Sequence, residues 1–500
     1  MKSMPAYTIK FLTGSQDLYG DETLAQVASN SKKVVEALNQ SGLMPCPIVW
    51  TPTVLTPEGI KAELEAAQAD QGCAGVIAWM HTFSPAKMWI AGLSVWKKPL
   101  LQLNTQFNRD LPYADIDMDF MNLNQSAHGD REFGFITARM DIPRTVIAGH
   151  WGNTHTQERI ARWMRVACAV ADGKTLKIAR FGDNMREVAV TDGDKVAAMI
   201  RYGWSVPYYG IGDLAERIRS VSDADTNRMV DLYAAEYAIQ DGPDPAYTRT
   251  HIREQARIEI ALRSFLDEIG AKAFTTNFQD LHGLTQLPGL ACQRLMADGY
   301  GFAGEGDWKT AALVRTFKVM SAGCEGKGFG NSFMEDYTYH FGNADRDALV
   351  LGAHMLEICP SIAEGKARLE VHPLGIGDRD APARLVFDAK PAPAICAAVT
   401  DFGNHFRCII NKVQVVKPEG PFPKLPVARV LWKPEPDMIR AAEAWIYAGG
   451  GHHTAFSNIV TADMVRDWAE MTGTECVLID NSTTEASLRN ELRWNASYWR

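Results

Sequence analysis

The feature that most constrains the fold is an alternation of short apolar runs with helical patterns, from Tyr7 to about residue 170. Parallel strands joined by crossover helices produce this pattern. Thr56-Pro57 and Ser84-Pro85 mark helix starts, because each offers a hydroxyl cap followed by proline at the first helical position. We therefore predict an N-terminal α/β domain over residues 1–172. Its expected strands lie at 7–12, 46–50, 73–80, 99–104 and 145–151.

The pattern of the remaining residues predicts a second α/β domain followed by a β-rich domain. A strand at 176–181 opens the central domain, 173–325, which continues through strands at 205–209 and 271–277. The fold class is thus two successive Rossmann-like or flavodoxin-like parallel-sheet domains, followed by a β-rich, barrel-like domain over 326–500. Helices of the central domain are expected at 213–219, 226–239, 248–269 and 307–321. Strands of the last domain are expected at 337–341, 348–356, 368–373, 383–387 and 406–416, with a helix at 462–471 and a strand at 476–479.

Composition indicates an ordinary globular protein that stays in a reducing compartment. Hydrophobic residues make up 46% and charged residues 22%, and the formal charge of -9 accompanies no basic stripe. Nucleic acid and anionic membranes are therefore not expected as partners. Nine dispersed cysteines without a CxxC pair are typical of buried free thiols. With no apolar run near the roughly 20 residues of a membrane span, we expect a cytoplasmic protein.

Signals for nucleotides or a nucleophilic serine are weak or missing. Gly210-Ile211-Gly212 fits a loose dinucleotide fingerprint, but its acidic partner would be Asp231, inside a helical pattern. We interpret this segment as a structural turn. Gly326-Lys327-Gly328 lacks the spacing and the following hydroxyl residue of a P-loop, and the sequence contains no G-x-S-x-G elbow.

Two glutamates and two histidines lie beside glycines and aromatics, where a core would not favour them. They are Glu305, Glu335, His354 and His453. A shell of two carboxylates and two imidazoles suits Mn²⁺, Mg²⁺ or Co²⁺, whereas structural zinc more often recruits thiolates. Taken singly, each residue has a plainer interpretation, a solvated loop glutamate or a core histidine. His452 points away from its neighbour in an extended chain, so it binds a substrate hydroxyl or only orients its loop.

Longer motifs resemble the L-arabinose isomerase family. They are Thr13-Gly14-Ser15-Gln16-Asp17-Leu18-Tyr19-Gly20, Gly304-Glu305-Gly306-Asp307-Trp308-Lys309-Thr310, Ser332-Phe333-Met334-Glu335-Asp336-Tyr337-Thr338-Tyr339-His340 and Gly451-His452-His453-Thr454. The likeness runs in order from about Tyr7 to Trp494. One departure is the glycine-rich segment 324–330, which is longer than the resemblance leads us to expect.

The resemblance implies an isomerase that converts L-arabinose to L-ribulose through an enediol. It implies one Mn²⁺ per subunit, with Co²⁺ or Mg²⁺ as substitutes, held by Glu305, Glu335, His354 and His453. The two glutamates would also move protons as the catalytic acid and base. A homohexamer with active sites shared between subunits is implied as well. The residues expected to contact the sugar are Gln16, Leu18, Tyr19, Phe83, Gln125, His128, Met185, Phe278 and His452.

Two other functions remain open at this stage. A related sugar such as D-galactose or L-fucose could be the substrate, since one pocket contact changes preference by only about 1 to 3 kcal/mol. A non-catalytic, metal-containing sugar-binding protein is the alternative from another class. Two retained carboxylates argue against it, because binding alone needs no proton transfer.

Overall fold

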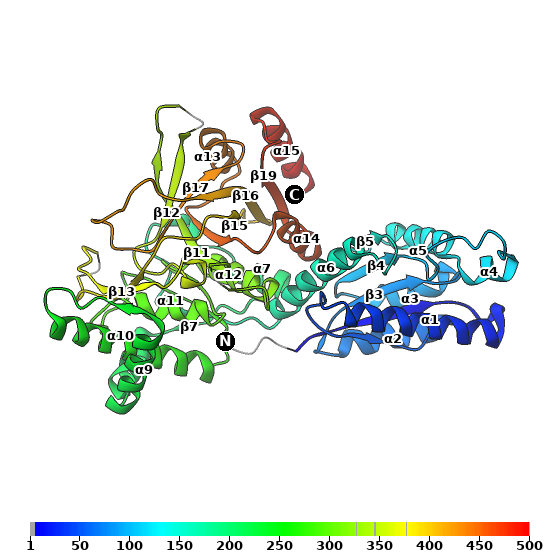
Figure 1. Ribbon diagram of the computed structural model, residues 1–500, viewed down its shortest axis with the longest axis horizontal. Helices are drawn as coiled ribbons and strands as arrows, with labels where there is room; N and C mark the ends of the chain where they lie inside the picture. The colour runs from blue at the N-terminus through cyan, green and yellow to red at the C-terminus, as the bar shows by residue number, and fades with distance from the viewer. Residues whose placement is uncertain (1–5, 327, 345–346, 377, 500) are drawn as a thin grey trace. The chain divides into compact units, whose positions relative to one another are not determined.

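The computed structural model describes residues 6–326, 328–344, 347–376 and 378–499 (Figure 1). The chain divides after Asp172 into two compact units. Lys327, in the middle of the glycine-rich segment, lies outside the described residues. None of the described helices is both long enough and apolar enough to cross a membrane.

The first unit is built on a parallel sheet of five strands in the order β2-β1-β3-β4-β5. Every neighbouring pair is parallel, as the alternating pattern predicts. Strand β2 begins only after Pro47, which has no N–H to donate to a ladder. The strands are β1 (Thr8–Gly14), β2 (Ile48–Trp50), β3 (Cys73–Met80), β4 (Leu100–Asn104) and β5 (Thr145–Ala148).

Helices pack on both faces of this sheet, which is why β3 is buried along its whole length. One face of β3, with Val76 and Met80, shares a core with α2, α3 and α5. On the other face Trp163 of α6 packs at Gly75, where an added Cβ would lie 3.1 Å from its ring. Figure 1 shows these helices in blue and cyan. They are α1 (Gly20–Gln40), α2 (Pro57–Ala69), α3 (Ile90–Val95), α4 (Met118–Leu123), α5 (Ser126–Arg139) and α6 (Thr154–Gly173).

The second unit begins with a smaller parallel sheet in the order β10-β9-β6-β7. Its strands are β6 (Ile178–Phe181), β7 (Tyr208–Tyr209), β9 (Ala273–Thr276) and β10 (Gly301–Ala303). Its helices are α7 (Lys195–Tyr202), α8 (Ile211–Ser220), α9 (Asp223–Glu236), α10 (Pro245–Glu268), α11 (Gly289–Ala297) and α12 (Trp308–Met320). Gly210 is the N-cap of α8, so the loose glycine fingerprint is a helix start.

The β-rich part of the second unit closes into a barrel. Its strand order is β15-β18-β11-β12-β17-β16, and β15 also pairs with β16, which joins the two ends. Strand β19 continues the sheet beyond β16. These elements confirm the predicted class of two parallel-sheet regions followed by a barrel. The strands are β11 (Asn331–His340), β12 (Leu349–Ala353), β15 (Pro393–Asp401), β16 (Phe406–Val416), β17 (Arg429–Pro434), β18 (His453–Ser457) and β19 (Glu475–Ile479).

Several element boundaries differ from the sequence-based expectation for identifiable reasons. The helix expected over 226–239 ends at Glu236, because Ala238–Ile239 form β8 and pair with β13 (Arg368–Val371). The strand expected over 348–356 stops at Ala353, and His354 therefore lies just beyond the ladder. Strands β10, β15, β17 and β18 were not predicted, and β11 begins at Asn331, whereas the expected strand begins at 337. Strand β15 is rich in alanine, which disfavours strands, and β18 starts inside a polar, glycine-flanked segment. The second unit also contains β14 (Ala383–Val386), α13 (Met438–Tyr447), α14 (Ala462–Thr472) and α15 (Glu485–Tyr498).

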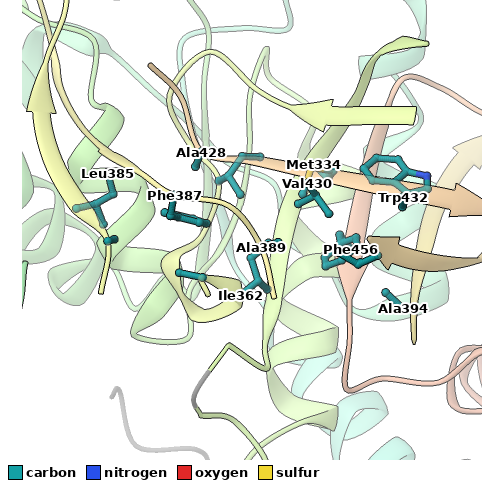
Figure 2. Close-up of a cluster of buried hydrophobic side chains, with 14 of the residues drawn as sticks. Met334, Ile362, Leu385, Phe387, Ala389, Ala394, Ala428, Val430, Trp432 and Phe456 are labelled. Atoms are coloured by element: carbon teal, nitrogen blue, oxygen red, sulfur yellow. The ribbon is translucent and has the colours of Figure 1, made fainter. Parts of the chain in front are cut away.

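The barrel core is packed so tightly around Trp432 that it admits only glycine at one position. Figure 2 shows Trp432 with Met334 and Val430 in this buried cluster. A Cβ at Gly352 of β12 would lie 1.9 Å from the Trp432 ring and 3.0 Å from the sulfur of Met334. Neither neighbour can move far, because Trp432 is 1% exposed and Met334 fully buried.

Gly352→Ala is therefore expected to destabilise the barrel by overpacking, by about 1 to 3 kcal/mol. The measurement is the urea midpoint of barrel unfolding, followed by tryptophan fluorescence. Gly420→Ala is the matched control, because no atom lies within 4 Å of the added Cβ. Equal midpoints for the two variants would contradict this account of the core.

Candidate metal and proton-transfer site

Glu305 stands in a strained turn directly after β10. Its φ is 61° and that of Gly306 is 82°, so two successive residues adopt left-handed backbone, which is rare for a glutamate. Two hydrogen bonds hold the turn: Met185 N–H donates to the Glu305 carbonyl at 2.9 Å, and Gly306 N–H donates to Thr276 O at 3.0 Å. The turn directs the Glu305 carboxylate at the histidines of the barrel.

Barrel pairing supplies the other three residues. Glu335 of β11 is the direct ladder partner of His453 on β18 and of Ala353 on β12. His354 follows Ala353 immediately, so one glutamate of the central strand has a histidine on each side. Gly304 leaves space for this arrangement, since a Cβ there would come within 3.0 Å of His354 Cε1.

The ligand atoms converge. One from each of Glu305, His354 and His453 lie within 4.8 Å of one another, which makes them a group able to hold a metal ion. Glu335 Oε2 lies 4.0 Å from His354 Nε2, and Glu305 Oε2 lies 3.8 Å from His453 Nε2. The Phe333 ring packs against both imidazoles, with its centroid 4.8 Å from that of His354 and 5.0 Å from that of His453. Three of the four residues that the sequence proposed as ligands form this group, and the fourth, Glu335, lies beside it at His354.

A buried carboxylate orients each histidine, and the sequence analysis missed both carboxylates. His453 Nδ1 donates to Asp307 Oδ2 at 3.2 Å, and His354 Nδ1 donates to Glu357 Oε2 at 2.5 Å. A proton held on Nδ1 leaves the Nε2 lone pair free to bind a cation. Accordingly, His453 Nε2 is buried without a hydrogen-bond partner among the described residues. Their spacing in the sequence could have indicated them, because each acid lies two or three residues from a proposed ligand.

The electrostatics of the site lower the pKa of two of its carboxyl groups, those of Asp307 and Glu305. Burial alone would raise the pKa of Asp307, but Lys309 and the hydrogen bond from His453 lower it to about 2. The pKa of Glu305 is lowered chiefly by a hydrogen bond from His452, with the His453 and His354 imidazoles adding to the effect. Burial lowers the pKa of His354, yet the nearby Glu357 outweighs it, and the net direction is upward.

Three of the proposed sugar contacts lie around this cluster. His452 Nε2 is 3.5 Å from Glu305 Oε2, and that bond raises the pKa of His452. His452 therefore contacts a carboxylate of the site directly. Phe278 stacks on His354 with ring centroids 5.9 Å apart, and the Met185 backbone holds the Glu305 turn.

The other six proposed contacts belong to the first unit and gather at the carboxyl ends of β1 and β3. Gln125 Nε2 donates to the Tyr19 hydroxyl at 3.2 Å, and Phe83 packs on His128 at 4.6 Å between ring centroids. Phe83 and His128 also line a hollow of 620 Å³. Gln16 is partly exposed, whereas Leu18 is 83% exposed and covers no core within this unit.

Comparison with known proteins places the chain in a family. Domain models described as the N-terminal, central and C-terminal domains of L-arabinose isomerase match residues 3–175, 177–323 and 330–475. The chain is similar over its full length to the L-arabinose isomerase of Geobacillus thermodenitrificans, with 58% identity and 100% of both chains covered. For that of Thermotoga petrophila the identity is 56%, covering 100% of this chain and 99% of the relative. The identity to the L-arabinose isomerase of Halalkalibacterium halodurans is 54%, and the match covers 99% of this chain and 98% of the relative.

Two parallel-sheet regions, a barrel and this match of all three domains define an enzyme of the aldose–ketose isomerase class. Within that class, the chain belongs to the L-arabinose isomerase family.

Asp307→Asn is expected to weaken Mn²⁺ binding by about 10- to 100-fold, because an amide orients His453 less strongly than a carboxylate. Asparagine retains the oxygen that accepts from Thr310 N–H, so the cap of α12 survives. Isothermal titration of the metal-stripped protein with Mn²⁺ measures the effect. Asp437→Asn makes the same change at the N-cap of α13 and is expected to bind like the parent protein. Equal affinities in both variants would show that Asp307 has no part in holding His453.

Proposed function

We propose that this protein converts L-arabinose to L-ribulose, with Glu305 and Glu335 as the catalytic acid and base. The proposal is supported by the full-length similarity to proteins named L-arabinose isomerase. The observation that carries the chemistry is the convergence of the Glu305 carboxylate with two carboxylate-oriented imidazoles in the second unit, with Glu335 beside one of them. The reaction moves a hydrogen from C2 of the aldose to C1 of the ketose through an enediol.

The donor set fits a divalent cation, and we propose Mn²⁺, with Co²⁺ or Mg²⁺ as substitutes. Glu305, Glu335, His354 and His453 would hold it through two oxygens and two nitrogens. The buried Nε2 of His453 supports this, because it has no hydrogen-bond partner in the described part of the chain, and a buried polar nitrogen without a partner costs free energy that a cation would offset. When bound, the ion would polarise the sugar carbonyl and stabilise negative charge on neighbouring oxygens.

The two glutamates would divide the proton transfers. His452 and the neighbouring imidazoles hold Glu305 as a carboxylate, which suits it to accept the C2 proton. Glu335, whose Oε2 lies 4.0 Å from His354 Nε2, would move a proton between the C1 and C2 oxygens. Asp307 and Glu357 would keep the imidazoles fixed while these protons move.

The sugar contacts that the family resemblance implies lie in each unit separately. Met185, Phe278 and His452 belong to the second unit, and the first unit carries Gln16, Leu18, Tyr19, Phe83, Gln125 and His128. The family resemblance supports a cytoplasmic homohexamer whose active sites are shared between subunits. In that assembly the exposed Leu18 would contact a sugar or a partner subunit rather than water.

Glu305→Gln and Glu335→Gln are each expected to keep the fold and to lower turnover by about 100-fold or more, because each removes a proton-transfer group. The assay is the appearance of L-ribulose from L-arabinose with Mn²⁺ present. Glu364→Gln, an exposed glutamate of the same part of the chain, is the matched control and is expected to retain activity. Turnover close to the parent rate in either site variant would remove that residue from the mechanism.

Chelation is expected to abolish turnover and to lower the melting temperature, since a cation that binds only the folded protein stabilises it by mass action. Adding Mn²⁺ back should restore both properties. A panel of L-arabinose, D-galactose and L-fucose, assayed in the same way, tests the substrate. If another sugar is converted faster, that sugar replaces L-arabinose as the proposed substrate and the proposed mechanism is unchanged. Full activity after metal removal would refute the metal assignment.

A further inference from the structure

Two cysteines of the first unit that are far apart in sequence bring their thiols into contact. Cys46 Sγ and Cys168 Sγ are 3.7 Å apart across a separation of 122 residues. Both are free, Cys46 being partly exposed and Cys168 buried. A disulfide joins its sulfurs at about 2.05 Å, so the gap to close is about 1.7 Å. Changing a χ1 rotamer moves a cysteine sulfur farther than this.

The backbone holds Cys46 firmly at this position. It stands between Pro45 and Pro47, and a residue flanked by two prolines has few accessible backbone conformations. Beyond Pro47, the Asn39 side chain donates to Ile48 O at 2.8 Å and accepts from Ile48 N at 2.9 Å. The Pro47 carbonyl also accepts from Ile9 N–H, at the start of the β1–β2 ladder. The partly exposed thiol is thus presented by a fixed segment.

Cys168 is held with similar firmness on α6. It lies on the buried side of the helix, whose neighbours Met164 and Ala167 are fully buried. Trp163, one turn earlier, is anchored against β3 at Gly75. The contact between the thiols therefore joins two rigid elements.

The two thiols are unequal in reactivity. The hydrogen bond from Cys168 lowers the pKa of Cys46, and Arg165 adds to this, although burial opposes it. The same contact and burial raise the pKa of Cys168 well above its ordinary value. The more accessible sulfur is therefore the one that more readily becomes a thiolate, which is the attacking species in thiol–disulfide exchange.

We propose that Cys46 and Cys168 form a redox modification site, which a small oxidised disulfide of the glutathione type converts to an intramolecular disulfide. The Cys46 thiolate attacks one sulfur of the oxidant, forming a mixed disulfide and releasing one thiol. Cys168 loses its proton to water and attacks Cys46 Sγ, which forms the Cys46–Cys168 bond and releases the second thiol. Two protein thiols are oxidised by two electrons, and the oxidant is reduced to two thiols. The product fastens the segment before β2 to α6.

The test uses the full-length protein and glutathione disulfide. After incubation, remaining thiols are alkylated under denaturing conditions, and the peptides are identified by mass spectrometry. We expect Cys46 and Cys168 to escape alkylation and to appear as one linked peptide pair. Dithiothreitol should restore alkylation at both.

Three variants separate the steps. Cys46→Ser should leave Cys168 alkylated, because the attacking thiol is gone. Cys168→Ala should stop the reaction at a glutathione adduct on Cys46. Cys324→Ser removes an exposed thiol of the other unit and should form the linked pair as the parent protein does.

Results with the parent protein alone can overturn the proposal. It fails if Cys324 acquires glutathione, which shows that the oxidant is active, while Cys46 and Cys168 both remain alkylated. It also fails if the adduct on Cys46 persists without resolution by Cys168, or if Cys46 becomes linked to another cysteine.

Discussion

The register of β11 against its two neighbours is the constraint on which the site depends. Glu335 is paired with His453 on one side and with Ala353 on the other, and His354 follows Ala353. A slip of one residue in a ladder turns every side chain to the opposite face. Closure of the barrel through β15 and β16 fixes this register, because a closed sheet has no free edge along which a strand can shift.

The left-handed turn at Glu305 and Gly306 adds the Glu305 carboxylate to the residues that the barrel positions. This turn is costly for a glutamate, and it persists because the Met185 and Thr276 backbones hold it. Asp307, two residues later, both caps α12 and binds His453. The segment 305–307 therefore connects β10 of the parallel sheet to α12 and also contacts His453 of the barrel.

The buried carboxylates of Asp307 and Glu357 each have two partners. Asp307 interacts with Lys309 and His453, and Glu357 accepts from His354 and from the Leu356 backbone. A buried carboxylate without such partners would be strongly destabilising. The first unit uses different chemistry: neutral amides, hydroxyls and aromatic rings at the strand ends, and a pair of contacting thiols beside β2.

The sequence by itself determined the fold class and named Glu305, Glu335, His354 and His453, because apolar periodicity and long motifs are local properties of the chain. It did not predict β15 and β18, nor the roles of Asp307 and Glu357. An alanine-rich run becomes a strand only when neighbouring strands bury it, and an acidic residue becomes a histidine's partner only when folding removes both from water. The contact between Cys46 and Cys168 is likewise a product of packing alone, since 122 residues separate the two thiols. Tertiary structure decided these features because each depends on which distant segments share a dry interior.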